Sequence, residues 1–561
     1  MLRYAPHFAV LVLIGPIFCG LLATLFPAFG FFPALGRTSF SFEHFHNAFN
    51  AQGIMRSIGV SLLTGLVTTF LSLALVILFF AAWSGKPLFE RVQHLLSPLL
   101  SIPHAAAAFG FAFMIAPSGW IMRLVSPELT GFTRPPDWHL LNDPYGISMM
   151  GGLVIKEVPF LFLVSLAAMS QVKVKDYERV ATGLGYGRIS GFIFTSWPLI
   201  YRQIRLAVFA VIAYATSVVD VAIILGPTNP APLAVRLMDW MNDPDLTMRF
   251  QASAGAVLQL LLTLAALLIW LLGEKLGAGL FARLSVSGQR FASDKPLRML
   301  SGLSMLALAV FVFLGLIILG LWSFAGYWSF PDALPRQFTF RTWDRHLVSV
   351  GGPFQTTLLL GIVATLLAIA IALACLEREA RTGRTGGTRA LELLYLPLII
   401  PQPAFLFGLQ MLFLTMGINA SFAALVLVHL VFVLPYVFLS LSDPWRAFDK
   451  RYSWAAQSMG VSKSRIFWRI RVPILMRPIL VAMAIGFAVS IGQYLPTVLI
   501  GAGRWPTLTT EAVALASGGD RRVIGVYAFL QMLLPFIGFA LAALIPAVLF
   551  AKRRGMKAVG G

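Results

Sequence analysis

The feature that most constrains this chain is a series of long apolar segments that recurs from one end to the other. An α-helix needs a run of about 18 residues or more to cross the hydrocarbon core of a bilayer, and buried helices of soluble proteins rarely need so long a run. Composition agrees, because 58% of the 561 residues are apolar and only 12% are charged, about half the charged fraction of a typical soluble domain. The sequence therefore predicts an all-α, polytopic membrane protein.

Twelve segments are predicted to span the membrane, six in each half of the chain. Their approximate bounds are 8–26, 57–83, 92–117, 147–171, 204–226, 250–272, 299–321, 354–376, 391–416, 419–441, 478–501 and 523–550. The stretch 273–298 between the sixth and seventh is polar and basic, and it contains Gly and Ser. We therefore expect an N-terminal half (1–272), a cytoplasmic linker (273–298) and a C-terminal half (299–561).

Basic residues indicate the orientation. Loops on the side that carries both termini hold about 30 of the 43 lysine and arginine residues, against about 12 on the other side. Cytoplasmic loops collect these residues, so both termini are predicted to face the cytoplasm. The net charge of +20 then needs no nucleic-acid partner to explain it. The two cysteines, Cys19 and Cys375, lie in apolar runs and are expected to be packing residues, with no disulfide and no metal site.

An internal repeat joins the two halves. Residues 181–226 align without a gap to 456–501, at an offset of 275, with nine identical positions. Typical residue frequencies would give roughly three. An earlier pair of segments also corresponds, Ile102-Pro103 with Gly110 and Ile400-Pro401 with Gly408. Because six helices return the chain to the same side, the halves are predicted to be parallel repeats with a pathway between them.

The most informative segments are two long cytoplasmic loops, residues 178–205 and 453–479. In each, a short helical stretch ends at a glycine, Gly185 or Gly460, and thirteen residues later comes a proline, Pro198 or Pro473. A glycine can take a positive φ and turn the chain after a helix, and proline suits the first turn of the next one. We therefore predict a helix–turn–helix hairpin on the cytoplasmic face of each half.

These loops resemble the EAA loop of the MetI-like permeases of binding-protein-dependent ABC importers, whose short coupling helix docks on an ATPase subunit. The second loop keeps Ala455 and Ala456 of that motif. The first keeps Ala181 and has Glu178 one position early, while Trp454 and Arg179 stand where the family has glutamate. Gly185 to Pro198 and Gly460 to Pro473 match the family's spacing.

The resemblance covers both halves, as in the fused double-length permeases of ferric-iron and thiamine importers. The run LFPAFGFFPALG, residues 25–36, is similar to the YnjC-type subgroup. The resemblance implies a multi-pass subunit of a bacterial inner membrane. Its implied partners are two copies of a cytoplasmic ABC ATPase and a periplasmic solute-binding protein, which selects the solute.

The chain itself is not predicted to be an enzyme. No phosphate-binding sequence of the type G-x-x-x-x-G-K-[ST] occurs in it, so ATP hydrolysis is expected on a separate subunit. No cofactor is predicted. A membrane enzyme acting on lipid-linked substrates would be expected to carry clustered carboxylates or histidines in a polar loop, and the sequence has no such cluster.

Charged residues within spans are candidates for the pathway, because charges at membrane depth are costly and usually face a partner or a passage. They are Lys156 and Glu157 in the fourth span and Asp220 in the fifth. Two isolated histidines, His104 and His429, are expected to be hydrogen-bonded packing residues. An ion-coupled secondary transporter that uses Glu157 or Asp220 remains the alternative to an ATP-driven importer.

Overall fold

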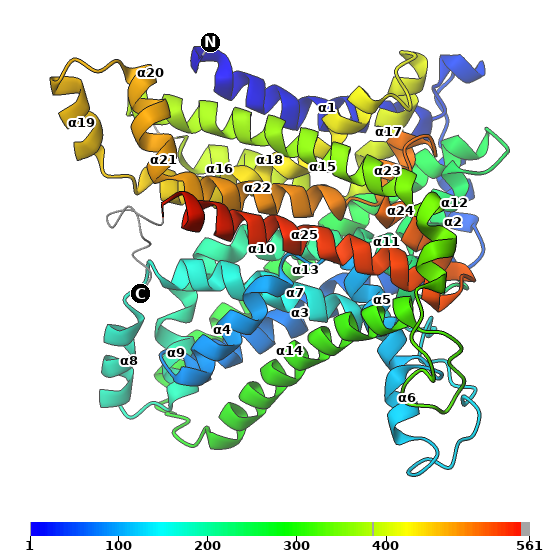
Figure 1. The fold of residues 1–561 in the computed structure, drawn as a ribbon, viewed down its shortest axis with the longest axis horizontal. Helices are drawn as coiled ribbons and strands as arrows, with labels where there is room; N and C mark the ends of the chain where they lie inside the picture. The colour runs from blue at the N-terminus through cyan, green and yellow to red at the C-terminus, as the bar shows by residue number, and fades with distance from the viewer. Residues whose placement is uncertain (1, 384–385, 551–561) are drawn as a thin grey trace.

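The computed structural model describes residues 2–383 and 386–550. The C-terminal residues 551–561, predicted to be cytoplasmic, lie outside the described part. Within the described residues the chain forms helices and no strand, with two isolated β-bridges, Phe32 to Arg37 and Ala325 to Phe338. Figure 1 shows the long helices lying side by side in one bundle. The prediction of an all-α polytopic membrane protein is confirmed.

The helices follow one another in a similar order in the two halves. Those of the first half are α1 (Ala5–Ala28), α2 (Glu43–Asn50), α3 (Ile54–Trp83), α4 (Pro87–Leu99), α5 (His104–Ile115), α6 (Trp120–Val125), α7 (Ile147–Met169), α8 (Val174–Gly183), α9 (Arg188–Thr195), α10 (Trp197–Ser217), α11 (Asp220–Leu225), α12 (Leu233–Met241) and α13 (Met248–Val286). Those of the second half are α14 (Lys295–Phe324), α15 (Arg341–Thr382), α16 (Gly387–Ile399), α17 (Gln402–Thr415), α18 (Phe422–Arg446), α19 (Lys450–Ser458), α20 (Lys463–Ile466), α21 (Val472–Ile474), α22 (Met476–Ile491), α23 (Leu495–Gly501), α24 (Leu508–Ala514) and α25 (Arg521–Leu549).

Ten helices of the described residues are long and apolar enough to cross a membrane, or up to twelve if two bent helix pairs each count as one span. The bent pairs coincide with the ninth and eleventh predicted spans. The predicted segments 92–117 and 391–416 are each divided between two helices, α4 and α5 in the first and α16 and α17 in the second. Pro103 and Pro401 stand in extended backbone just before α5 and α17 and interrupt each helix. Proline cannot donate the helical hydrogen bond, and it disfavours helical backbone in the residue before it.

The sequence repeat corresponds to a repeat of elements. Helices α7 and α18 begin at matched positions of the repeat, Ile147 and Phe422, and so do α11 and α23, at Asp220 and Leu495. The short helices α12 and α24 also follow the repeat, beginning at Leu233 and Leu508. Each half therefore carries the same series, a long helix, a hairpin, a second long helix and two short helices.

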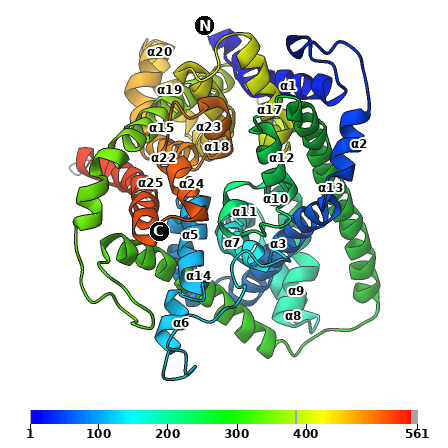
Figure 2. The same ribbon diagram turned by 90° about the vertical axis from the view of Figure 1, so that its right-hand side faces the viewer.

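The first long helix of each half bridges the two halves. Helix α1 packs most extensively against α17 of the second half and also against α13 of its own, and α14 packs against α5 and α3 of the first half and against α25 of its own. In Figure 2, α1 lies beside α17 and α13, while α14 lies beside α5. The two halves are thus intertwined and not merely placed side by side.

Glycines make these crossings possible. A Cβ added at Gly20 would collide with the carbonyl oxygen of Phe405, and one at Gly408 would collide with the backbone of α1. At the corresponding crossing, a Cβ on Gly110 would lie 3.0 Å from the backbone of Gly315. The matched glycines Gly110 and Gly408, noted in the sequence, are therefore the points where a helix from the other half crosses.

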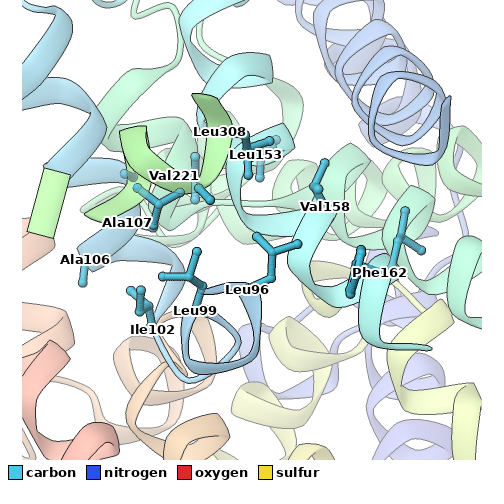
Figure 3. Packing of buried hydrophobic residues seen from close by; sticks show 14 of the residues in the cluster. Leu96, Leu99, Ile102, Ala106, Ala107, Leu153, Val158, Phe162, Val221 and Leu308 are labelled. Carbon is cyan, nitrogen blue, oxygen red and sulfur yellow. The ribbon is translucent and has the colours of Figure 1, made fainter. Parts of the chain in front are cut away.

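Buried apolar side chains fill the space around these crossings. Figure 3 shows one part of this core, with Leu96 and Leu99 of α4, Leu153, Val158 and Phe162 of α7, Val221 of α11 and Leu308 of α14. This core holds α7 in place, and with it the charged pair Lys156 and Glu157 between Leu153 and Val158.

Candidate functional site

Each half carries a helical hairpin at the same end of the bundle, formed by α8 and α9 in the first half and by α19 and α20 in the second (Figure 1). The turn after each first helix is the same. The N–H of Gly185 donates to the carbonyl of Thr182, and the N–H of Tyr186 donates to that of Ala181. This pair of bonds satisfies carbonyls left free at the helix end and needs left-handed backbone at the glycine. Gly185 has φ +81°, as predicted.

The second hairpin repeats this turn with Gly460, which has φ +76°. Its N–H donates to Gln457, and the N–H of Val461 donates to Ala456. The predicted positive φ is therefore confirmed at both glycines. In both hairpins the N–H of the residue after the glycine donates to the carbonyl of a motif alanine, Ala181 or Ala456. That alanine is buried in each case, whereas Ala455 is exposed.

The two prolines lie where the hairpins lead into the membrane. Pro198 is in the first turn of α10, as predicted. Pro473 is in the three-residue helix α21, and the chain then bends by 76° before α22 begins at Met476. The second hairpin therefore joins its span through a kink, whereas the first leads almost directly into α10.

The first hairpin is tied to the end of α3 and to the segment between the halves. Glu178 accepts a hydrogen bond from Ser84 (3.1 Å) and lies 3.9 Å from Arg188. Asp294 accepts from the N–H of Ile189 (2.9 Å) at the start of α9. A carboxylate at a helix N-terminus stabilises it by satisfying a free N–H group. Arg290 stacks on the Tyr186 ring at 4.6 Å.

The second hairpin is tied to the end of α15 by a buried ion pair. Glu377 is paired with Arg471 and also with Arg381 (2.6 Å). Arg471 packs over the rings of Trp445 and Phe448. Since both ends of this pair are largely buried, removing one partner would leave an uncompensated charge, which is strongly destabilising. In each half, the hairpin is thus fastened to the C-terminal end of the long helix α3 or α15.

Both hairpins present apolar side chains outward. Tyr177 and Leu184 of the first are exposed, and so are Tyr452 and Met459 of the second, at the matching positions of the repeat. Trp454 is also exposed. Exposed apolar groups that recur at matched positions indicate a surface that meets another protein. The candidate docking surface is therefore defined as Tyr177, Leu184, Tyr452, Trp454 and Met459.

The charged residues predicted at membrane depth are buried. Lys156 donates from Nζ to the carbonyl oxygens of Leu99 (3.3 Å) and Leu100 (2.9 Å). These carbonyls lie at the C-terminal end of α4, where Pro103 has no N–H to offer Leu99, whose carbonyl accepts instead from the N–H of Ile102 (3.3 Å). Lys156 therefore stabilises the helix break in this structure.

Glu157 points away from that break, toward α5. One of its carboxylate oxygens lies 3.3 Å from Nε2 of His104, whose ring packs against Tyr214 at 4.6 Å. Tyr214 in turn interacts with Asp220. The structure thus brings together Glu157 and Asp220, which belong to different predicted spans, through His104 and Tyr214.

The other histidine has the packing role expected from the sequence. His429 is buried, and its two ring nitrogens lie 2.9 Å from Ser490 and 3.0 Å from Thr497. For His104 the expectation is met only in part. Its side chain is 29% exposed and pairs with a carboxylate.

Sequence reasoning missed several of these residues. Tyr177 and Tyr452 could have been found, because the ungapped alignment at offset 275 extends through them. Glu377 and Arg471 could not, since they are 94 residues apart and no local pattern pairs them. The contacts that Arg290 and Asp294 make with the first hairpin were also missed, because both residues lie in the segment 273–298, which was predicted to be only a linker.

Comparison with known proteins identifies relatives. Residues 364–555 match the family described as "Binding-protein-dependent transport system inner membrane component". The chain is 32% identical over 558 residues to the "Inner membrane ABC transporter permease protein YnjC" of Escherichia coli strain K12, covering 99% of each chain.

Shorter similarities involve single-length permeases. The "Spermidine/putrescine transport system permease protein PotC" of Haemophilus influenzae is 24% identical over 153 residues, which are 27% of this chain and 60% of the relative. The "Molybdenum transport system permease protein ModB" of Mycobacterium tuberculosis is 27% identical over 179 residues, 29% of this chain and 68% of the relative.

Proposed function

Because this chain belongs to the family of inner membrane permeases of binding-protein-dependent ABC importers, we propose that its two hairpins, α8–α9 and α19–α20, are the sites where a separate ATPase docks and transmits force. The function as an importer permease, and not an enzyme, follows from the family. The assignment of the hairpins is the proposal, with Glu178, Ala181, Gly185 and Pro198 shaping the first, and Ala455, Ala456, Gly460 and Pro473 the second.

The observation that carries the proposal is the paired turn. Two hairpins at corresponding places in the repeat have the same hydrogen-bonded glycine turn, lie at the same end of the bundle and present matched exposed apolar residues. Cytoplasmic loops that obeyed only the charge rule of topology would have no reason to share a turn or an apolar surface.

The proposal extends to the organisation of the complex. The halves 1–272 and 299–561 each receive one ATPase copy, the segment 273–298 joins them, and both termini lie in the cytoplasm. A periplasmic solute-binding protein delivers the solute to the opposite face. The solute passes between the halves, near Glu157 and Asp220, while Lys156 keeps the end of α4 in place.

The test is purification of the tagged chain from membranes of its host, with mass spectrometry of the proteins that accompany it. An ATPase should accompany the wild type, and it should be lost when Tyr177→Asp and Tyr452→Asp are combined. The matched control is Tyr145→Asp, an exposed tyrosine at the other end of the bundle, which should retain the ATPase. Retention of the ATPase by the double variant would contradict the proposal.

A further inference from the structure

The segment that follows α1 is rich in phenylalanine. It begins within the run 25–36 and continues to α2, at the end of the bundle opposite the hairpins (Figure 1). The proposed coupling function gives this segment no role. Six of its residues between positions 29 and 45 are phenylalanines: Phe29, Phe31, Phe32, Phe40, Phe42 and Phe45.

These rings gather around the last turn of α1. Phe26, in that turn, lies 6.0 Å from Phe31 between ring centroids, and Phe31 stacks on Phe40 at 5.2 Å. Phe29, directly after α1, lies 5.3 Å from Phe42. Residues at both ends of the loop are therefore held at the level where α1 ends.

Backbone hydrogen bonds close the loop on itself. The N–H of Ser41 donates to the carbonyl oxygen of Phe29 (2.7 Å), which returns residues 40–42 to the end of α1. Phe32 and Arg37 exchange two backbone hydrogen bonds, at 2.9 and 3.3 Å. Such internal bonds suit a loop at a bilayer surface, because free N–H and carbonyl groups are costly where water is scarce.

Two rings of the loop are nevertheless turned away from the protein. Phe40 is 67% exposed and Phe42 is 74% exposed, and Phe26 in the last turn of α1 is exposed as well. We call Phe26, Phe40 and Phe42 the phenyl patch. A single exposed apolar side chain needs no explanation, but a group of large rings at one place indicates contact with another apolar phase or molecule.

The phenyl patch continues the lipid-facing side of α1. Exposed apolar residues recur along this helix at spacings of seven, four and three residues, which places them on one side: Leu11, Phe18, Leu22 and Leu25. Because α1 is a candidate span, that side faces lipid. With 24 residues, α1 is about 36 Å long against about 30 Å for a hydrocarbon core, so its last turn reaches the bilayer surface.

The composition of the segment favours lipid over a soluble partner. Between positions 26 and 50 the charged residues are Arg37 and Glu43, and Arg37 is exposed. A surface that meets a soluble protein is usually about as polar as the rest of the exterior. Exposed rings beside an arginine suit a bilayer surface, where the rings enter the acyl region and the guanidinium meets phosphates.

We propose that the phenyl patch is embedded in the bilayer surface, with Phe40 and Phe42 at the boundary between acyl chains and headgroups and Arg37 beside lipid phosphates. The partner is therefore phospholipid. The patch fixes the end of α1, the helix that bridges the two halves, at the membrane surface. This inference does not depend on where an ATPase docks.

The experiment places a spin label at single cysteines in a chain carrying Cys19→Ser and Cys375→Ala. Phe40→Cys and Phe42→Cys are the test positions. Phe18→Cys, exposed within α1, calibrates contact with lipid, and Leu246→Cys, exposed in the loop before α13, calibrates contact with water. Each labelled chain is reconstituted in nanodiscs of phosphatidylethanolamine and phosphatidylglycerol. Collisions with oxygen, which concentrates in lipid, are compared with collisions with a water-soluble nickel chelate.

The ratio of oxygen to nickel collisions at both test positions should be several-fold higher than at Leu246 and should approach the ratio at Phe18. Ratios equal to that at Leu246 would overturn the inference. So would labels that are shielded from nickel only after a periplasmic binding protein is added, because the patch would then be a protein contact.

The wild type provides a measurement that does not depend on how the cysteine variants fold. A phospholipid with a photoreactive diazirine in its acyl chain, near the glycerol, should crosslink to peptides covering residues 29–45 in nanodiscs. Peptides covering residues 242–247, at the same end of the bundle, should not be labelled. Equal labelling of the two segments, or labelling of neither, would contradict the embedded patch.

Discussion

Individual buried charges in this protein are each held by identifiable partners. Lys156 is held by two carbonyls, and Glu377 by Arg381 and Arg471. Asp143 receives hydrogen bonds from the N–H groups of Ile147 and Ser148, both at 2.8 Å. Because a buried charge without partners is severely destabilising, these contacts account for how so apolar a bundle accommodates charges.

Asp143 provides a prediction at this scale. Burial raises the pKa of its carboxyl, but the hydrogen bonds from Ser148 and Ile147 outweigh burial, and the pKa is lowered overall. Asp143→Ala should destabilise the start of α7 by about 1–2 kcal/mol, the usual loss for a helix cap. The measurement is the thermal midpoint in detergent, with Asp137→Ala as a control that should leave the midpoint unchanged.

The same residue gives a pH dependence with a defined sign. A carboxyl whose pKa is lowered by folding contributes stability above its unfolded pKa, and that stability is lost as the pH falls through the folded pKa. The difference in midpoint between wild type and Asp143→Ala should therefore be full at pH 7 and shrink below about pH 4. A difference that grew on acidification would contradict this account of Asp143.

At the residue scale, the sequence could predict features that are visible within one segment but not contacts between distant segments. Glu157 and Asp220 were identifiable because a charge within an apolar run needs no partner to be noticed. Their connection through His104 and Tyr214 was not identifiable from the sequence. His104 and Glu157 are 53 residues apart, and their contact depends on how α5, α7 and α10 pack. His104 alone looked like an ordinary packing histidine.

At the scale of elements, each hairpin has a turn that requires a positive φ at its glycine, and there is free space around that glycine. An added Cβ at Gly185 or Gly460 would contact nothing within 4 Å. Substitution there therefore acts through the left-handed backbone and not through a collision. A β-branched residue in that conformation is strained by about 1–2 kcal/mol or more, while asparagine tolerates it.

Gly185→Val and Gly460→Val should thus insert and fold, but fail to couple ATP hydrolysis to transport. Gly460→Val should be the more damaging, because the second hairpin is the more basic and keeps both alanines. Gly460→Asn and Gly183→Ala are the controls, and both should couple. The measurement is ATPase copurification followed by solute-stimulated hydrolysis in reconstituted membranes. Normal coupling in both valine variants would leave the hairpins without a role in transmission.

The helix crossings lead to another prediction. Gly20 of α1 lies against the backbone of α17, so Gly20→Val should prevent the two helices from meeting and should sharply lower the yield of folded protein. Gly15→Ala on the same helix meets only the end of Leu11 at 3.7 Å and should be tolerated. Size-exclusion chromatography of the membrane extract measures the outcome. A monodisperse Gly20→Val variant with a wild-type midpoint would argue against the crossing.

The membrane-spanning helices were predictable from the sequence because the length of an apolar segment is enough to identify them. Ten of the twelve predicted spans overlap candidate spans, and the other two overlap bent helix pairs. The breaks at Pro103 and Pro401 were not predicted, because proline also occurs within continuous helices of this chain, for example Pro159 in α7. Tertiary contacts decide whether a proline ends a helix, here the lysine that binds the carbonyls at the end of α4.

At the scale of the whole molecule, the packing of α1 and α14 across both halves makes the halves depend on one another. A sequence repeat predicts two similar units, but it says nothing about which unit each first helix packs on. That choice is decided by small residues at distant positions, such as Gly110 with Gly315. The predicted halves 1–272 and 299–561 therefore describe how the sequence is divided. They do not predict which helices pack against one another.

Orientation is the prediction that belongs to this scale. In a variant with Cys19→Ser and Cys375→Ala, single cysteines at the exposed positions Leu129 and Tyr327 should react with a membrane-impermeant thiol reagent in intact spheroplasts. A cysteine at exposed Val286 should react only after lysis. The reverse pattern would place the hairpins outside the cell and remove them from any cytoplasmic ATPase.

The central claim is that ATP hydrolysis on a partner moves solute through this chain by way of its two hairpins. The most direct measurement is uptake by proteoliposomes containing the chain, its copurified ATPase and the loaded binding protein, with ionophores present to collapse every ion gradient. The account predicts that uptake requires ATP, continues with the ionophores present and is abolished by Gly460→Val but not by Gly460→Asn. Uptake that an imposed ion gradient drives without ATP, or that Gly460→Val leaves intact, would contradict it.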